Sequence, residues 1–224
     1  MPHLSASTKE FLIDLKANNE RPWFEANKPR YEEARADFIS LIGILLHEIE
    51  KFDPRIGGLD AKRCVFRIYR DTRFSKNKTP YKTNFGARIL YGGSRNLHLR
   101  AGYFMNIEPG NCFLGGGAFR PSGEWINAIR RRIEDDAGPL KNILKRKVFR
   151  NYFDGIEGES VKTAPRGYAK DHPEIRLLRQ KSFLARHRLP DEQVFSPGFL
   201  KHAATVYRAL KPFDDFLNEA IDPS

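Results

Sequence analysis

The feature that most limits the fold of this chain is a change in the spacing of its apolar residues near residue 64. Between Tyr31 and Ile49 apolar residues recur every three or four positions, which predicts a long amphipathic helix whose apolar stripe we assign to core packing. From Cys64 onward the spacing becomes two, and strands are predicted at 64–69, 86–91, 97–107 and 112–115. Because no segment of helical length separates them, we expect an antiparallel meander.

Helices are expected on both sides of this strand-rich part. Before it, Ser7 and Glu10 match a capping box, and Pro22 suits the first turn of a second helix. After it, helices are predicted from residues 122, 140, 173 and 196, a fifth strand at 182–186, and a separate last helix opened by Pro212. The sequence therefore predicts a single α+β domain over residues 1–224, an antiparallel sheet of about four to five strands flanked by N-terminal and C-terminal helices.

Composition excludes several classes of protein. With 40% hydrophobic and 30% charged residues, the 224-residue chain matches a globular protein. Residues 1–5 lack the pattern of a signal peptide, and the longest apolar run, 38–46, is too short to cross a bilayer. The two cysteines, Cys64 and Cys112, form no closely spaced pair, which excludes a zinc ribbon or a disulfide framework. We therefore expect a cytoplasmic protein without a membrane partner.

The positive charge of the chain is concentrated in one region. The formal net charge is +11, and residues 62–100 hold eleven Lys and Arg against a single acid, Asp71. A second basic segment, residues 162–188, holds eight Lys and Arg against Asp171 and Glu174, and acidic helices elsewhere compensate for it. A local excess of this kind is typical of a surface that binds anions.

The stretch 67–84 within the first region is the strongest candidate site. Arginine offers a planar fork for phosphate or carboxylate, lysine a mobile charge, and aromatic rings can stack on bases. The carboxylate of Asp71, isolated among these cations, should have a depressed pKa. We expect it to orient the arginines rather than to transfer protons. The candidate ligand-binding residues are Arg67, Tyr69, Arg70, Asp71, Arg73, Lys76, Lys78, Tyr81 and Lys82.

Several partners fit this stretch, and nucleic acid is the first choice because a long surface of one sign binds phosphates by counterion release. A small phosphorylated or carboxylated ligand, acted on by an enzyme, needs only two or three of these charges. The most informative observation on this stretch would be whether Arg67, Arg70, Arg73 and Lys82 converge on one concave spot. The remaining alternatives are a protein-interaction module for an acidic partner and a solvated loop whose arginines pair with acidic helix faces.

Other candidate residues are weaker. His172, beside Asp171 in a basic loop, is the candidate acid or base. The glycines at 115–117 could expose amides to an anion before a helix, although a bulge or close packing is the favoured interpretation. Asp53, Asp60 and Lys62 fit a nuclease site poorly. The histidines show no metal-ligand spacing, and no motif for a cofactor is present.

Five blocks together resemble one family across nearly the whole chain. They are residues 18–24 (NNERPWF), 66–84 (FRIYRDTRFSKNKTPYKTN), 102–110 (GYFMNIEPG), 113–117 (FLGGG) and 165–172 (PRGYAKDH). The chain resembles the family known as domain of unknown function 2461, and the block 66–84 is its longest and most specific part. The resemblance implies no activity, so no catalytic residue is transferred from it.

Overall fold

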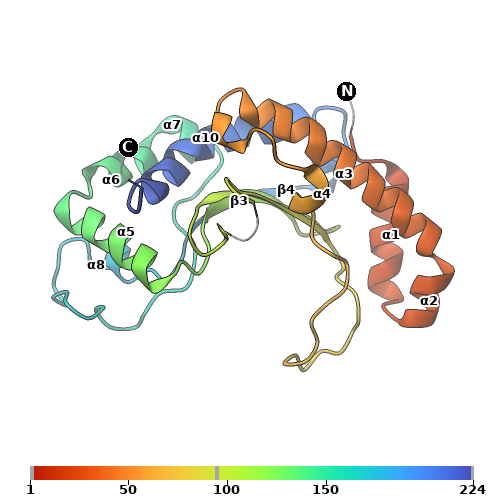
Figure 1. Cartoon of the computed structure of the whole chain (residues 1–224), viewed down its shortest axis with the longest axis horizontal. Coiled ribbons are helices and arrows are strands. Elements are labelled where there is room, and N and C mark those ends of the chain that lie inside the picture. The colour runs from red at the N-terminus through yellow and green to blue at the C-terminus, as the bar shows by residue number, and fades with distance from the viewer. Residues whose placement is uncertain (1–2, 94–95, 223–224) are drawn as a thin grey trace. The chain divides into compact units, whose positions relative to one another are not determined.

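The α+β prediction is confirmed by the computed structural model, which describes residues 3–93 and 96–222 (Figure 1). The first helices are α1 (Ala6–Ala17), α2 (Arg21–Ala26), α3 (Lys28–Glu50), η1 (Pro54–Ile56) and α4 (Ala61–Cys64). The strands of the described residues are β1 (Phe85–Ile89), β2 (Gly102–Ile107), β3 (Cys112–Ala118) and β4 (Phe183–Leu189), in the antiparallel order β1-β2-β3-β4. The later helices are α5 (Gly123–Asp135), α6 (Gly138–Lys145), α7 (Lys147–Arg150), α8 (Ile175–Leu178), α9 (Asp191–Val194) and α10 (Phe199–Asn218).

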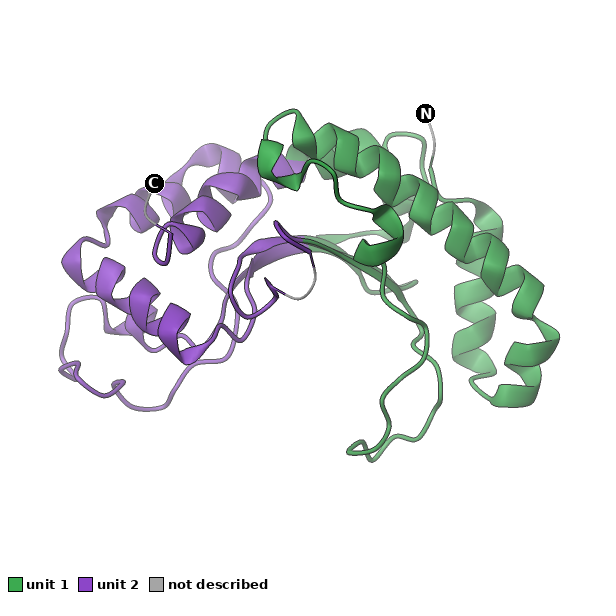
Figure 2. Cartoon of the chain, in the orientation of Figure 1, with its two compact units in different colours: residues 1–89, 104–114, 188–205 green, residues 90–103, 115–187, 206–224 purple. Residues whose placement is uncertain are grey.

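The chain divides into two compact units (Figure 2). Unit 1 comprises residues 1–89, 104–114 and 188–205, and unit 2 comprises residues 90–103, 115–187 and 206–224. Strands β2, β3 and β4 and helix α10 each contribute residues to both units. The single domain expected over residues 1–224 stays a prediction.

In unit 1, helix α1 begins earlier than the sequence predicts. The Ser5 side chain accepts a hydrogen bond from the Thr8 amide (3.2 Å), so Ser5 caps the helix and Ser7 lies inside it. Asp37 of α3 orients this cap, because its Oδ2 accepts hydrogen bonds from the Ser5 amide and the Ser5 hydroxyl, both at 2.9 Å. The predicted capping box of Ser7 and Glu10 is therefore wrong, since a carboxylate from a distant helix selects the other serine.

The long helix predicted between Tyr31 and Ile49 is confirmed as α3. Its apolar stripe is buried in the core of unit 1: Ala34, Phe38, Leu41, Ile42, Leu45, Leu46 and Ile49. The Phe85 ring of β1 stacks on Phe38 of α3 (5.5 Å between centroids) and on Phe11 of α1 (6.3 Å). These stacked rings join both helices to the first strand and hold the end of the segment that leads from α4 into β1.

The first predicted strand, residues 64–69, does not form. Helix α4 extends to Cys64, and two isolated antiparallel bridges follow, Val65 with Ala87 and Tyr69 with Tyr81. The chain instead pairs with its own return arm: the Arg70 amide donates to the Pro80 carbonyl (2.9 Å). Because proline has no N–H, it cannot return that bond, and the pairing stays too sparse for a strand.

In unit 2, only part of the segment predicted as a strand at 97–107 is one, since β2 starts at Gly102. The Asn218 side chain accepts a hydrogen bond from the Ala101 amide (2.8 Å) and donates one to the Ala101 carbonyl (3.2 Å). An amide side chain thus replaces the strand partner just before β2, and the ladder begins one residue later.

Pro212 lies inside α10 and does not open a separate helix, so that prediction is wrong. Phe213, Phe216 and Leu217 after it are buried, and the Trp125 indole N–H of α5 donates to the Leu217 carbonyl (2.8 Å). An interior proline costs about 3 kcal/mol or more, and burial of three large apolar side chains at about 1.5–3 kcal/mol each offsets that cost. The helices predicted from Ser122 and Leu140 are confirmed as α5 and α6, although α6 already begins at Gly138, and the strand predicted at 182–186 is β4.

Among residues 3–93 and 96–222, no helix combines the length and the apolar character that crossing a membrane requires.

Candidate functional site

The candidate stretch forms a hairpin between α4 and β1 in unit 1, which we call the basic hairpin, residues 66–84 (Figure 1). Its two arms are joined by the Tyr69–Tyr81 bridge and by a hydrogen bond from the Lys82 amide to the Ile68 carbonyl (2.8 Å). At its base, the Phe66 ring lies under the Lys82 ammonium (5.2 Å) and the Arg88 guanidinium (4.9 Å). The stretch is therefore an ordered projection and not a loose loop.

Three cations of the hairpin bind its own backbone and side chains. Arg70 donates to the Thr79 carbonyl (3.0 Å) and also to the Thr79 hydroxyl. Lys78 Nζ donates to the Thr72 carbonyl (2.9 Å), and Lys82 Nζ donates to the Arg67 carbonyl (2.7 Å). Arg70, Lys78 and Lys82 thus stabilise the shape of the hairpin.

Asp71, the single acid of the hairpin, pairs with Arg73. The Arg73 Nε and Nη2 donate to the two carboxylate oxygens at 3.0 and 2.7 Å, and the Arg73 amide donates to Oδ1 at 3.2 Å. These hydrogen bonds lower the pKa of Asp71 to about 2 and raise the pKa of Arg73. The predicted depression of the Asp71 pKa is confirmed, and the carboxylate orients one arginine.

The tip of the hairpin presents an aromatic ring to solvent. Phe74 is 95% exposed, and the Arg73 guanidinium lies 5.8 Å from its ring centroid. Lys76 follows two residues later, and its side chain has no hydrogen bond or ion pair with any described residue. An aromatic side chain left so open between cations is unusual, because its burial would contribute about 1.5–3 kcal/mol.

The two tyrosines of the hairpin differ in accessibility. Tyr81 is 2% exposed, its ring stacks on Phe24 at 3.9 Å, and its backbone exchanges two hydrogen bonds with the Asn19 side chain (3.0 and 3.1 Å). Tyr69 is 49% exposed. Tyr81 anchors the hairpin to α2, and Tyr69 keeps a face that a ligand can reach.

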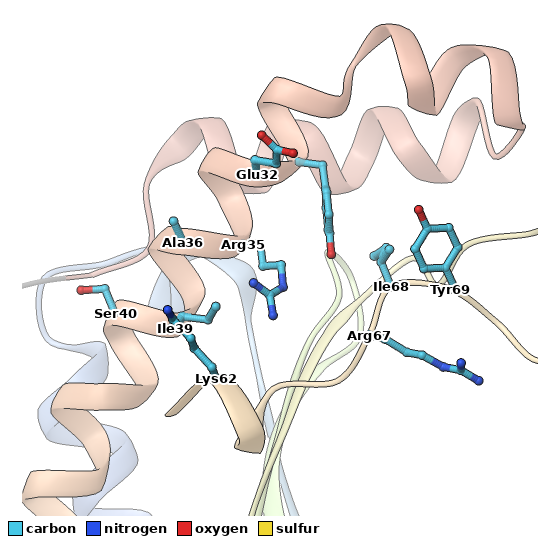
Figure 3. A pocket seen from close by; sticks show the side chains of 10 residues that line it. Glu32, Arg35, Ala36, Ile39, Ser40, Lys62, Arg67, Ile68 and Tyr69 are labelled. Carbon is cyan, nitrogen blue, oxygen red and sulfur yellow. The ribbon is translucent and has the colours of Figure 1, made fainter. Parts of the chain in front are cut away.

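The cations Arg67, Arg70, Arg73 and Lys82 point to different places. Arg70 and Lys82 bond within the hairpin, Arg73 pairs with Asp71, and Arg67 lines a pocket in unit 1. The pocket has a volume of about 620 Å³ and lies between one face of α3 and residues 62–69 (Figure 3). Its lining residues are Tyr31, Glu32, Arg35, Ala36, Ile39, Ser40, Lys62, Arg67, Ile68 and Tyr69.

Two cations of this pocket come from segments that sequence reasoning assigned to other roles. Arg35 extends from α3 into the pocket, and Lys62 reaches from α4 toward α3, whereas Arg67 extends away from both (Figure 3). Burial raises the pKa of Tyr31, and the charge of Arg35 acts against that rise. Tyr31 was missed because it belongs to the apolar stripe of α3, which indicates packing. The only signal for Arg35 is the polar face of the same helix.

The remaining candidates lie in unit 2. His172 Nδ1 accepts a hydrogen bond from the Glu174 amide (3.1 Å), a local contact that supports the start of α8. The glycines at 115–117 are buried within β3, and a Cβ at Gly116 would collide with the Gly102 carbonyl and the Leu210 side chain. Close packing is therefore the confirmed interpretation of these glycines.

In the part of the chain that the structure describes, no group of three or more His, Cys, Asp or Glu side chains is arranged to hold a metal ion. The cysteines are buried free thiols, and burial raises the pKa of Cys64 to about 11 and that of Cys112 to about 12. Thiols held in the protonated form are poor nucleophiles, so neither one indicates catalysis.

Comparisons with known proteins identify the family and nothing finer. No curated protein and no solved structure matched the chain. One family model, described as "Conserved hypothetical protein (DUF2461)", matches residues 7–216, which confirms the resemblance carried by the five sequence blocks. The chain belongs to this family of conserved hypothetical proteins.

Proposed function

We propose that unit 1 binds single-stranded nucleic acid through the basic hairpin. The observation that carries the proposal is Phe74, whose ring is 95% exposed at the tip between Arg73 and Lys76. A ring in this position can stack on an unpaired base while the neighbouring cations contact the flanking phosphates. Tyr69, half-exposed on the same hairpin, offers a second ring along the path of the strand.

The internal hydrogen bonds of the hairpin support this function. Because Arg70, Lys78 and Lys82 already bond to hairpin acceptors, the hairpin is ordered before a ligand arrives. Less conformational entropy is then lost on binding, which favours affinity. Arg73 must partly exchange the Asp71 carboxylate for a phosphate, whereas Lys76 and Arg67 have no such partner to give up among the described residues.

The test is fluorescence anisotropy of labelled single-stranded oligonucleotides with the full chain. Binding should weaken steeply between about 50 and 200 mM salt. Phe74→Ala should raise Kd about 5- to 100-fold, because stacking on an aromatic side chain contributes about 1–3 kcal/mol per base. The matched control is Lys145→Ala with Lys147→Ala, two exposed lysines of unit 2, which should change Kd less than about threefold.

Two results would contradict the proposal. The first is an unchanged affinity in Phe74→Ala together with Lys76→Ala. The second is a preference for an acidic peptide over an oligonucleotide of equal charge, which would favour a protein-interaction module. An enzyme that acts on a small anion at the hairpin gains no support, because the hairpin cations do not converge.

The location that we propose for this activity is the cytoplasm. Its support is the pair of free thiols, Cys64 and Cys112, since thiols stay reduced there.

A further inference from the structure

We propose that the pocket between α3 and residues 62–69 is a second, separate site, which binds a small organic phosphate monoester. Its charged end would be held by Arg35 and Lys62, and its organic part would lie against Ile39, Ile68 and the tyrosines (Figure 3). Arg67 and Tyr69 belong both to this lining and to the hairpin, whereas Arg35 and Lys62 lie outside the hairpin and Phe74 and Lys76 lie outside the pocket. Variants of these four residues therefore test the two proposals separately.

The cations of this pocket are unpaired among the described residues. The side chains of Arg35, Lys62 and Arg67 have no hydrogen bond or ion pair with any described residue. Elsewhere in unit 1 basic side chains meet acids, as Arg30 meets Asp14 at 2.7 Å. Arg35 and Lys62 thus share a concave site in which the one acid of the lining, Glu32, pairs with neither of them. Unpaired cations in such a site attract an anion, and arginine matches the geometry of phosphate with two parallel donors.

The backbone that carries Arg35 and Lys62 is held in place by helix α3 and by the capped start of α4. Arg35 is half-buried on a long helix, which limits the rotamers that its side chain can adopt. Lys62 lies in the first turn of α4, whose start is capped by a hydrogen bond from the Lys62 amide to Asp60 Oδ1 (2.9 Å). Binding groups carried on such supported backbone form a more defined site than groups on a free loop.

The size and the aromatic lining of the pocket fit the organic part of a ligand. A volume of about 620 Å³ exceeds the need of an inorganic phosphate and lies in the range of sites for small organic molecules. Tyr31 is held by Phe24 and Phe11, with ring centroids 5.1 and 6.0 Å away, so one aromatic wall is fixed. Tyr69 also lines the pocket and is 49% exposed, so a second ring is accessible to a ligand.

Glu32 narrows the class of ligand further. It is the acid among the lining residues, and its carboxylate can accept hydrogen bonds from hydroxyl or amino groups. A second anionic group next to it would be repelled. The chemistry therefore favours a ligand with a single phosphate and with hydrogen-bond donors on its organic part, as in nucleoside monophosphates and sugar phosphates.

The test is isothermal titration of the full chain with the four common nucleoside monophosphates, glucose 6-phosphate and inorganic phosphate, with the unphosphorylated nucleosides as a reference. At least one monoester should bind with 1:1 stoichiometry and at least about tenfold more tightly than inorganic phosphate or its own nucleoside. If none of these monoesters gives saturable binding at millimolar concentration, the proposal is wrong.

Variants separate this site from the hairpin. Arg35→Gln and Lys62→Gln should each raise the Kd of the monoester at least about tenfold, the effect of losing a charged hydrogen bond, with the far-ultraviolet circular dichroism spectrum unchanged. Lys62→Arg should restore most of the affinity. The matched control is Arg63→Gln, the exposed neighbour outside the pocket lining, which should bind as the unmodified chain does.

The two proposals fail in different ways. Phe74→Ala should leave the monoester affinity unchanged, and Arg35→Gln should leave oligonucleotide affinity within about twofold. Monoester binding that survives the combined loss of Arg35 and Lys62 would overturn the pocket proposal whatever the hairpin does.

Discussion

The two basic segments of this chain have similar composition but differ in what surrounds their charges. In unit 2, Lys181 and Arg186 of the segment 162–188 pair with glutamates at 157–159, and Arg179 donates to the Val161 carbonyl (2.8 Å). None of the exposed large apolar side chains lies in this segment. In the basic hairpin of unit 1, the one acid is taken by Arg73, and Phe74 stands in solvent. Charge density alone therefore does not distinguish a binding surface from a structural segment. The exposed aromatic ring among the cations is the feature on which we base the proposal for the hairpin.

Within the hairpin, two aromatic residues differ in their surroundings, and one of them should give the largest effect on the free energy of unfolding. Tyr81→Ala should lower the free energy of unfolding by about 3–4 kcal/mol, because it removes a buried ring stacked on Phe24. Phe74→Ala should change it by less than about 0.5 kcal/mol. Urea denaturation measures both. Equal losses would mean that the tip of the hairpin is packed and not available to a ligand.

The internal bonds of the hairpin are the next test. Arg70→Ala should release the Thr79 carbonyl and hydroxyl and destabilise the hairpin by about 1–3 kcal/mol, as expected for hydrogen bonds to a charged group. Hydrogen exchange of the Arg70 and Lys82 amides, which bridge the two arms, should accelerate accordingly. Arg73→Ala serves as control, since its partner Asp71 is its near neighbour in the chain. Unchanged exchange in Arg70→Ala would contradict a structural role for this arginine.

The comparison of the two segments themselves predicts a smaller effect on binding. Arg73→Ala together with Lys76→Ala should raise the oligonucleotide Kd about tenfold. The slope of the logarithm of affinity against the logarithm of salt concentration should fall by about 1.4, the value for two phosphate contacts on a single strand. Removing Lys162 and Lys170, two exposed lysines of unit 2, should change the Kd less than about twofold at the same loss of charge. Equal effects of the two pairs would remove the distinction between the segments.

The smallest effect should come from Asp71. Its pKa in the folded chain is lowered to about 2, below an unfolded value of about 3.9, so the stabilising contact with Arg73 is complete above pH 4 and is lost as the pH falls through 2. Nuclear magnetic resonance titration of the carboxyl carbon should report this low value, and Arg73→Gln should return it toward 3.9. Asp71→Asn should release Arg73 and lower the oligonucleotide Kd about twofold. A higher Kd in that variant would mean that the oriented arginine, and not a released one, contacts the ligand.

Much of the architecture was predictable because it depends on local patterns. Spacing of three or four residues marked α3, spacing of two marked β2, and the concentration of charge marked the hairpin. The low pKa of Asp71 followed from its basic neighbours alone. The errors arose where a distant group replaced a local rule. Asp37 of α3 selects Ser5 as the cap, and burial of Phe213 and Leu217 carries α10 through Pro212.

The sequence by itself determined the class of fold and the region where positive charge and aromatic rings occur together. The reason is that composition and the spacing of apolar residues are properties of short stretches. Only the tertiary structure decided that Tyr81 packs inward while Phe74 faces solvent, since both are aromatic residues of one basic segment. It also decided that Arg35 of α3 shares a pocket with Lys62 and Arg67. Residues so far apart in the chain line one pocket only through the packing of α3 against α4 and the residues that follow it, and no local pattern encodes that packing.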